Sequence, residues 1–296
     1  MEKKRALVTG LKGFTGYYVA AELESAGYEV FGADAVPNDL PNCFHVDLLD
    51  KVALQRVIDE VKPSVVVHLA AIAFVGHGSA DDFYRVNLVG TRHLLDALAS
   101  SGLSLDCVLL VSSANIYGNS TEGVLDEEVL PNPANDYAVS KLAMEYMARL
   151  WFDRLPIVIV RPFNYTGVGQ SKDFLLPKIV DHFRRRAPLI ELGNLDVSRD
   201  FSDVRVIARV YRALLEARPL GQVVNVCSGK AYSLQEVLDI VQRLSGHSLE
   251  VRVNPAFVRA NEVRMLRGNP DKLQNLIGKL EVPSLEETLA WMLEAQ

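Results

Sequence analysis

The sequence of 296 residues predicts an α/β protein, in which a doubly wound parallel Rossmann sheet precedes a smaller α/β C-terminal lobe. Short apolar runs alternate with longer helical patterns through the first half of the chain, and a glycine-rich turn follows the first run. The runs are rich in valine and leucine on both faces. Such strands are typical of a parallel sheet that helices cover on both sides.

Taken in order, the predicted strands are bounded by glycine, proline or polar turns and span residues 6–8, 30–33, 65–69, 108–111 and 157–160. The helical patterns between them span residues 17–26, 52–61, 82–100 and 137–151. From about Gln170 the regular alternation fails. Beyond it the sequence predicts helices at 174–186, 204–217, 233–245 and 285–293, with a strand at 223–226.

These elements suggest two parts. Residues 1–165, with a segment that returns to the sheet at about 199–225, are expected to form the Rossmann domain. Residues 166–198 and 226–296 are expected to form the lobe. No linker rich in glycine, serine or proline separates the parts. We therefore expect the lobe to pack on the carboxyl-terminal edge of the sheet, where such folds bind ligands.

The composition narrows the class of function. A formal net charge of −6 argues against a general nucleic-acid binder, although a single anionic ligand needs only a local group of arginines. Cys43, Cys107 and Cys227 lie far apart and the histidines are scattered, so we expect no metal site. The N-terminus has no signal-peptide pattern, and no apolar run reaches membrane-spanning length. The sequence thus predicts a cytosolic protein with no membrane partner.

The turn VTGLKGFTG at 8–16 joins the first strand to the first helix. Its glycines Gly10, Gly13 and Gly16 permit a tight turn and let the backbone approach a pyrophosphate at the helix N-terminus. The sequence therefore predicts a dinucleotide site here. The other loop residues expected to contact the dinucleotide are Lys12, Phe14 and Thr15.

Asp34 ends the second predicted strand, where a carboxylate can bond both ribose hydroxyls of the adenosine half. A carboxylate there repels a 2′-phosphate, so NAD(H) is favoured over NADP(H). Lys12 could offset that repulsion, which leaves NADP(H) open. Asp47 and Leu48, after a short third strand, either cap the adenine edge or form a simple polar turn.

Tyr137 and Lys141 form a YxxxK pair at the start of a helix, so both side chains share one face. The lysine cation is expected to lower the pKa of the tyrosine from about 10 toward neutrality. Ser113 ends a predicted parallel strand, where its hydroxyl could bond the same substrate oxygen that Tyr137 protonates. Three such groups in order after a dinucleotide loop predict a reactive centre.

These motifs resemble the extended short-chain dehydrogenase/reductase family, which includes sugar-nucleotide epimerases, dehydratases and reductases. The likeness covers nearly the whole chain. Its segments are TGLKGFTG at 9–16, HLAA at 68–71, VNLVGT around Asn87, SSANIYG at 112–118, YAVSK at 137–141 and RPFN at 161–164. The resemblance implies a bound NAD(P) and oxidoreductase chemistry on a nucleotide-activated sugar.

The resemblance also implies roles. In the family the tyrosine is the acid/base, the lysine holds the nicotinamide ribose and the Ser/Thr orients the substrate oxygen, which here are Tyr137, Lys141 and Ser113. Asn87 would support the lysine, or it is a helix polar group that is satisfied locally. The cofactor would also be lined by Leu69, Ala70 and Ala71.

Asn115 bears on the reaction. In the family's 4,6-dehydratases an acidic residue stands two positions after the catalytic Ser/Thr, and here that position holds an amide. An amide cannot act as a general base, so dehydration is not expected. Ketone reduction and 4-epimerisation remain, because both need only hydride transfer with the Ser–Tyr–Lys group.

The second half resembles one branch of the family, the GDP-4-keto-6-deoxymannose reductases and the related GDP-mannose 4,6-dehydratases. The segments concerned are GNLDVSRDF at 193–201, VVNVCSG at 223–229 and VRANEVRMLRGNPDKL at 258–273. In that branch, residues at the positions of Arg199, Arg259 and Glu262 hold the diphosphate and the nucleotide ribose. Guanidinium–phosphate and carboxylate–diol pairing fit these residue types. Asn164 would complete the diphosphate contacts, and Asn115 would line the substrate.

The chain departs from this branch at Ile72 and Ala73, where relatives usually carry polar Gln and Ser/Thr. The sugar therefore could differ from the usual one. The loop VGHG at 75–78 follows, in which His77 either contacts the substrate or is solvated. The usual Trp-x-Pro near the C-terminus is replaced by LEVP at 280–283.

The leading hypothesis is an NAD(P)H-dependent reductase of the C4 ketone of a 4-keto-6-deoxy sugar nucleotide, with a GDP-linked substrate favoured. The alternative is a sugar-nucleotide 4-epimerase that keeps NAD tightly bound. A third interpretation, a non-catalytic dinucleotide-binding regulator, requires loss of a reactive group that is present here. Helices 82–100 and 137–151 carry apolar residues on more than one face. Family members commonly dimerise through this pair, so we expect a homodimer.

Overall fold

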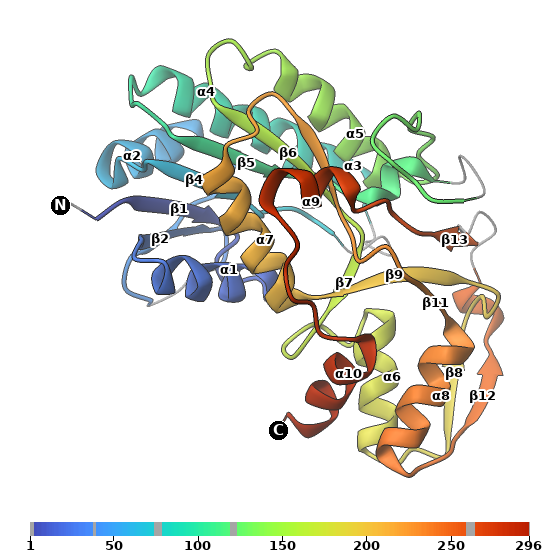
Figure 1. Cartoon of the computed structure of the whole chain (residues 1–296). Coiled ribbons are helices and arrows are strands. Elements are labelled where there is room, and N and C mark those ends of the chain that lie inside the picture. Colours follow the sequence, from blue (N-terminus) through green and yellow to red (C-terminus); the bar gives the residue numbers. More distant parts are fainter. Residues whose placement is uncertain (1–2, 38–39, 74–78, 119–122, 259–263, 296) are drawn as a thin grey trace.

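The structure is a computed structural model that describes residues 3–37, 40–73, 79–118, 123–258 and 264–295 (Figure 1). In this part of the chain, the central sheet has seven strands whose neighbours all pair in parallel. From edge to edge the strands are β3 (Cys43–His45), β2 (Glu29–Asp34), β1 (Arg5–Thr9), β4 (Val65–His68), β5 (Cys107–Val111), β6 (Ile157–Pro162) and β10 (Val223–Val226). This order confirms the predicted Rossmann fold class.

The winding of the sheet reverses beside β1. This strand pairs with β2 on one side and with β4 on the other, so the chain builds outward from it in both directions. In open α/β sheets, ligands bind outside the carboxyl ends of the strands at such a reversal. The segments that leave the carboxyl ends of β1 and β4 are the glycine turn and residues 69–72.

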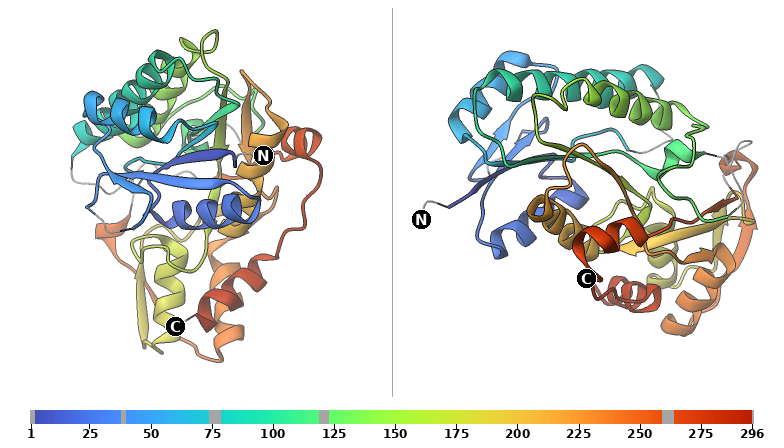
Figure 2. Two further views of the ribbon diagram at one scale, coloured as in Figure 1. Left: turned by 90° about the vertical axis from the view of Figure 1, so that its left-hand side faces the viewer. Right: turned by 45° about the horizontal axis from the view of Figure 1, so that its top comes forward.

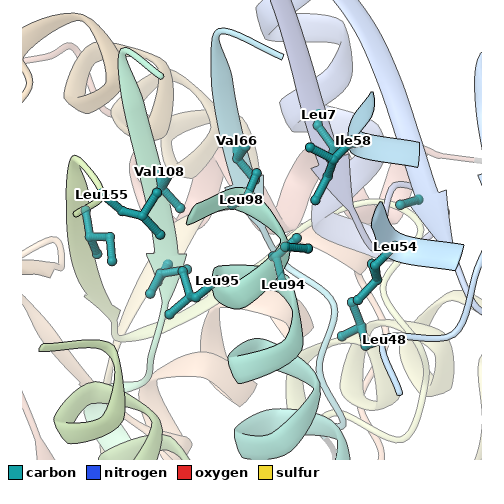
Figure 3. Close-up of a cluster of buried hydrophobic side chains, with 14 of the residues drawn as sticks. Leu7, Leu48, Leu54, Ile58, Val66, Leu94, Leu95, Leu98, Val108 and Leu155 are labelled. Atoms are coloured by element: carbon teal, nitrogen blue, oxygen red, sulfur yellow. The ribbon is translucent and has the colours of Figure 1, made fainter. Parts of the chain in front are cut away.

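Helices cover both faces of the sheet (Figures 1 and 2). One face carries α2 (Lys51–Val61), α4 (Thr91–Ser100) and α5 (Asp136–Arg149), whose apolar side chains pack against the strands in the cluster of Figure 3. The other face carries α1 (Phe14–Ser25), α7 (Val204–Ala217) and α9 (Asp271–Ile277). Because each fully buried Leu, Val or Ile contributes about 1.5–3 kcal/mol, these two clusters hold the helices firmly on the sheet.

Two helix boundaries depart from the prediction. Helix α1 begins at Phe14 rather than at residue 17, with Gly13 as its N-cap. The predicted helix 82–100 consists of α3 (Ala80–Phe83), a π-helical segment (Tyr84–Gly90) and α4. π-helical turns are rare in proteins, and those that occur often lie at functional sites. This one carries Asn87.

The lobe begins where β6 ends, at the carboxyl edge of the sheet, and Figure 2 shows it as a layer below the sheet domain. One small sheet joins β11 (Ala231–Ser233), β9 (Ser198–Asp203) and β13 (Met265–Leu266), with β7 (Asn164–Thr166) paired to β9. A second pairs β8 (Leu189–Leu192) with β12 (Glu250–Val253). The lobe core is closed by α6 (Leu175–Arg184), α8 (Leu234–Ser245) and α10 (Leu285–Glu294).

The two parts interleave along the chain. Strand β9 lies in the lobe sheet, whereas α7 and β10, which follow it, join the central sheet domain. Helix α9 falls within the lobe residues by sequence, yet its Leu273 packs in the cluster with α1 and α7. None of the described helices is both long and apolar enough to cross a membrane.

Candidate functional site

The glycine turn has no room for side chains. Gly10 has φ +74° and donates its N–H to the Ala33 carbonyl at 2.8 Å. A Cβ on Gly16 would lie 2.3 Å from the Gly10 oxygen, and one on Gly10 would lie 2.9 Å from the Ala70 nitrogen. The turn therefore brings bare backbone to the start of α1, as a pyrophosphate site at a helix N-terminus requires.

Two side chains of the first turn of α1, next to the glycine turn, contact the lobe. Phe14 stacks on Tyr165 with ring centroids 6.1 Å apart, and the Thr15 hydroxyl bonds the Tyr165 hydroxyl at 2.8 Å. Tyr165 lies on β7 of the lobe. These contacts fix the start of α1 against β7.

Asp34 lies at the carboxyl end of β2 beside the glycine turn. Its carboxylate accepts hydrogen bonds from the backbone N–H of Lys12 at 3.0 Å and of Val36 at 3.1 Å. The Lys12 ammonium donates to the Pro37 carbonyl at 3.2 Å. Lys12 therefore contacts Asp34 through its backbone N–H, whereas its ammonium group binds the Pro37 carbonyl.

Asp47 and Leu48 follow β3 and have separate environments. Asp47 is exposed and accepts the Leu49 N–H at 2.9 Å, which is the geometry of a polar turn. Leu48 is buried and packs against the backbone of Gly90. The Val46 N–H bonds the Asp34 carbonyl at 2.9 Å, which places this turn beside Asp34 at the same edge of the sheet.

The structure brings Ser113, Tyr137 and Lys141 together. Ser113 follows β5, and its hydroxyl accepts the Asn115 N–H at 3.1 Å and is hydrogen-bonded to Tyr137. Lys141, one turn after Tyr137 on α5, donates to the Val111 carbonyl at 2.8 Å. Tyr137 is 7% exposed, and the Phe83 ring meets it edge-on at 6.0 Å. The three groups form one nearly water-free cluster at the carboxyl end of β5.

The expected lowering of the tyrosine pKa is wrong for this structure. Burial raises the pKa of Tyr137 to about 12, against an opposing effect of its hydrogen bond with Ser113. Burial also lowers the pKa of Lys141 to about 8, while the nearby Glu145 raises it. Desolvation dominates the pKa of Tyr137 because a charged phenolate at this position would be withdrawn from water. Tyr137 is therefore a protonated phenol at neutral pH.

Asn87 is buried in the π-helical segment and bonds the segment after β4. Its side-chain oxygen accepts the Ile72 N–H at 2.9 Å, and its amide donates to the Ile72 carbonyl at 3.1 Å and to the Ser140 hydroxyl at 3.0 Å. These bonds hold the backbone that follows Leu69, Ala70 and Ala71. They link Asn87 to α5 through Ser140 rather than through Lys141.

Two of the predicted substrate residues, Asn164 and Arg199, lie on the lobe side. The Asn164 amide nitrogen, at the start of β7, is buried and finds no hydrogen-bond partner among the described residues. The Arg199 guanidinium, on β9, donates to the carbonyls of Ser198 at 2.9 Å and Arg264 at 3.2 Å. Asn115 is partly buried beside Ser113. The remaining candidates lie outside the described residues: Arg259, Glu262 and the His77 loop.

One buried ion pair near the reactive centre was not foreseen. Arg161 on β6 makes a two-pronged bond to Glu145, at 3.0 and 2.7 Å, and both side chains are at most 5% exposed. Arg161 also donates to the Tyr117 hydroxyl at 2.9 Å, which donates to Asn225 at 2.8 Å. Glu145 stands one helical turn beyond Lys141, and only this spacing could have suggested it from sequence.

Asp200 was also missed. It is completely buried next to Arg199, and its carboxylate accepts bonds from the Ser228 N–H at 2.9 Å, the Ser228 hydroxyl at 2.6 Å and the Gly229 N–H at 2.8 Å. Burial raises the pKa of Asp200 against the lowering effect of these bonds. Asp200 thus ties β9 to the turn between β10 and β11. Across the described ranges, no group of His, Cys, Asp and Glu side chains could hold a metal ion.

Comparisons with known proteins agree with this geometry. Residues 6–227 match the model of the NAD dependent epimerase/dehydratase family. A GDP-6-deoxy-D-talose 4-dehydrogenase of Aggregatibacter actinomycetemcomitans is 35% identical over 275 residues, 93% of this chain and 91% of the relative. A GDP-6-deoxy-D-mannose reductase of Pseudomonas aeruginosa is 34% identical over 286 residues, with the same two coverages. The structure of RMD from Pseudomonas aeruginosa complexed with NADPH superposes with a TM-score of 0.87 at 32% identity, over 98% of each chain.

Proposed function

Because this chain belongs to the NAD dependent epimerase/dehydratase family and is an NAD(P)-dependent oxidoreductase acting on nucleotide sugars, we propose that it reduces the C4 ketone of a 4-keto-6-deoxy sugar nucleotide. GDP-4-keto-6-deoxymannose is the favoured substrate, and a GDP-linked 6-deoxyhexose is the product. The names of both relatives describe GDP-6-deoxyhexoses. 6-Deoxytalose and 6-deoxymannose are epimers at C4, so oxidation of either alcohol at C4 gives the same 4-keto sugar.

The observation that carries the proposal is the buried, protonated Tyr137 hydrogen-bonded to Ser113. Reduction of a ketone leaves an alkoxide that must take up a proton. A phenol whose pKa is about 12 carries that proton at neutral pH, and a hydroxyl beside it can steady the same oxygen. The amide of Asn115 occupies the place where elimination would need a base, so the site favours reduction over dehydration.

Each residue then has a part in the proposed step. The reduced nicotinamide, when bound, supplies the hydride to C4. Tyr137 donates its proton to the forming alkoxide, and Ser113 holds that oxygen by its hydroxyl. Lys141 would hold the nicotinamide ribose, and its ammonium group would place a positive charge close to Tyr137. The low exposure of Tyr137 and Lys141 keeps bulk water from the reacting atoms.

We further propose how the two parts divide the ligands. Residues 1–165, with α7 and β10, hold the dinucleotide, and the lobe holds the nucleotide sugar. The buried, unpartnered amide of Asn164 supports a polar contact to substrate, since a buried donor without a partner is costly. Arg199 on the neighbouring β9, with Arg259 and Glu262, would complete the diphosphate and ribose contacts.

Asp34 favours NAD(H) in this proposal, with NADP(H) as the second cofactor. A carboxylate beside the glycine turn disfavours a 2′-phosphate, while the Lys12 ammonium nearby could attract one. The test is to mix the protein with GDP-4-keto-6-deoxymannose and either NADH or NADPH, and to follow the loss of nicotinamide absorbance. Rapid oxidation of one of the two would support the reductase and show which cofactor it uses. No oxidation with either one would rule it out for this sugar.

The second candidate is a sugar-nucleotide 4-epimerase, which Asp34 favours because a recycled, tightly held NAD suits that reaction. Cofactor that remains bound through purification would support the epimerase. Protein that is free of cofactor and active only with added NADH would contradict it.

We also propose a cytoplasmic homodimer formed through the helices at 82–100 and 137–151. Apolar side chains on the outer face of these helices are well exposed, Tyr146 by 58% and Leu150 by 77%. A single species of monomer mass in sedimentation at micromolar concentration would exclude the dimer.

A further inference from the structure

A set of buried polar side chains in the sheet domain is connected by hydrogen bonds next to the candidate cofactor site. These residues come from four elements, β1, β4, the π-helix/α4 pair and α5, and each is at most 3% exposed. Buried polar groups are stable only when they are hydrogen-bonded, so a connected set usually has a definite role. We call this set the His68 network: Thr9, His68, Asn87, Thr91 and Ser140.

Its hydrogen bonds fix the protonation of the histidine. The Thr91 hydroxyl donates to the Asn87 carbonyl at 2.7 Å, so it accepts from the Nε2 of His68, 2.8 Å away. The Nδ1 of His68 is then the acceptor for the Thr9 hydroxyl at 2.6 Å. Burial lowers the pKa of His68 to about 3, so the imidazole stays neutral with its proton on Nε2.

One end of the His68 network reaches the glycine turn. The Thr9 hydroxyl accepts the Ala70 N–H at 3.3 Å, and Thr9 immediately precedes Gly10. Gly10 itself packs directly on the Ala70 backbone, where no side chain would fit. Thr9 and His68 therefore set how closely the ends of β1 and β4 approach each other.

The other end reaches the first turn of α5. The Asn87 side chain holds both backbone groups of Ile72 and donates to the Ser140 hydroxyl. The Ser140 hydroxyl donates to the Tyr137 carbonyl at 2.8 Å. The wide π-helical turn carries Asn87 into this position, and Thr91 one turn later captures its carbonyl. These hydrogen bonds, joined through the backbone and side chain of Asn87, thus connect Thr9, which precedes the glycine turn, to the residue that bears the reactive hydroxyl.

We infer that the His68 network is a positioning device for the dinucleotide, and that His68 is its central positioning residue. It holds three backbone segments in register: the glycine turn at one half of the cofactor, and residues 69–72 and the start of α5 at the nicotinamide half. The inference rests on the proposed function for the placing of the nicotinamide at Tyr137. None of the five side chains needs to touch the cofactor, because the network bonds the backbone of Ala70, Ile72 and Tyr137, in segments that would line it.

Threonine-to-valine changes test the inference, since they remove one hydroxyl at nearly constant shape. Thr91→Val leaves the His68 Nε2–H and the Asn87 carbonyl without their shared partner. We expect the dissociation constant for NADH, measured by calorimetric titration, to rise about 3- to 10-fold, as loss of one buried hydrogen bond implies. KM for the nicotinamide should rise with it, and Thr91→Ser should restore both values.

The matched control is Thr288→Val in α10. Thr288 is as buried as Thr91, at 1% exposed, and its hydroxyl donates to Asp203 at 3.0 Å in the lobe. Both valine variants should unfold at lower temperature, but only Thr91→Val should weaken NADH binding. If Thr91→Val binds NADH like the parent protein, or if Thr288→Val weakens binding equally, the inference is wrong.

A double-mutant cycle tests whether the network acts as a unit. Thr9→Val and Ser140→Ala change its two ends, and changes without shared partners normally add. We expect the double variant to bind NADH about as weakly as the weaker single variant, whereas additive losses would contradict a single device. These titrations use NADH alone. Failure of the sugar reduction would therefore leave the network standing, and normal binding by Thr91→Val would remove the network without touching the proposed reaction.

Discussion

The two sides of the candidate site are built differently. On the sheet side the side chains of the His68 network bond one another, as His68 does with Thr9 and Thr91, so the fold itself fixes their positions, although the buried Ser112 hydroxyl nearby has no partner in the described chain. On the lobe side the Asn164 amide is buried with its nitrogen unpartnered in the described chain. The contrast indicates that the His68 network is organised before any ligand arrives, whereas the Asn164 nitrogen on the lobe side is a donor that a ligand would satisfy. Changes on the two sides should therefore alter different steps.

The largest expected effect comes from the reactive hydroxyl. Tyr137→Phe removes the proton donor but keeps the ring that packs against Phe83. We expect kcat for ketone reduction to fall by about 10²- to 10⁴-fold, the usual contribution of a general acid. The dissociation constant for NADH should change little, because the sheet side remains intact. Stopped-flow absorbance and calorimetric titration measure the two quantities, and an unchanged kcat would show that Tyr137 is not the proton donor.

The next largest effect concerns stability on the sheet side. Glu145→Gln leaves the Arg161 guanidinium buried without its counter-charge. We expect the free energy of unfolding to fall by about 3–5 kcal/mol, as for other broken buried ion pairs. Denaturant titration measures the loss. Replacing both partners, as in Glu145→Met with Arg161→Met, should recover much of it, and a single variant as stable as the parent would show that this pair does not organise the sheet side.

The lobe side should respond in substrate affinity alone. Arg199→Ala removes the guanidinium that we place at the diphosphate, while Asp200 next to it keeps the β9 backbone tied to Ser228 and Gly229. We expect KM for the sugar nucleotide to rise roughly 10- to 100-fold, the range for a hydrogen bond to a charged group, with the NADH dissociation constant unchanged. Equal weakening of both ligands would erase the distinction between the two sides.

The same contrast explains what the sequence could predict. Apolar strands and the glycine turn have short-range patterns, so the fold class and the grouping of Ser113, Tyr137 and Lys141 followed from them. The lobe strands are short, and β9 (SRDFSD) has no apolar periodicity, so they were missed. The tyrosine pKa was predicted in the wrong direction because the Tyr–Lys spacing indicates a nearby charge but not the depth of burial. The bonds of Asp200 to Ser228 and of Glu145 to Arg161 join residues of different segments, and no local pattern reveals such pairs.

The smallest expected effect is a pH dependence that belongs to the sheet side. Burial lowers the pKa of Lys141 from 10.5 to about 8, so its charge is lost as the pH rises through that value. If the ammonium holds the nicotinamide ribose, affinity for NADH should fall roughly fivefold between pH 8 and pH 9, following the charged fraction. The contribution of Lys141 to the free energy of unfolding should instead rise with pH in this range. Because the unfolded lysine keeps its proton up to about pH 10.5, the unfolded state binds more protons between the two values, and this group's contribution to stability rises with pH there.

Glu145 offers a way to sharpen this last prediction. Its carboxylate raises the pKa of Lys141 against the effect of burial, so a neutral residue at this position should move the midpoint of NADH binding below pH 8. The measurement is a series of NADH titrations from pH 6 to pH 10 on the parent protein and on folded Glu145→Gln. A midpoint that stays in place would mean that another group controls cofactor affinity. A shift to lower pH, with sugar affinity unaffected by the same change, would show that the buried ion pair tunes the cofactor side alone.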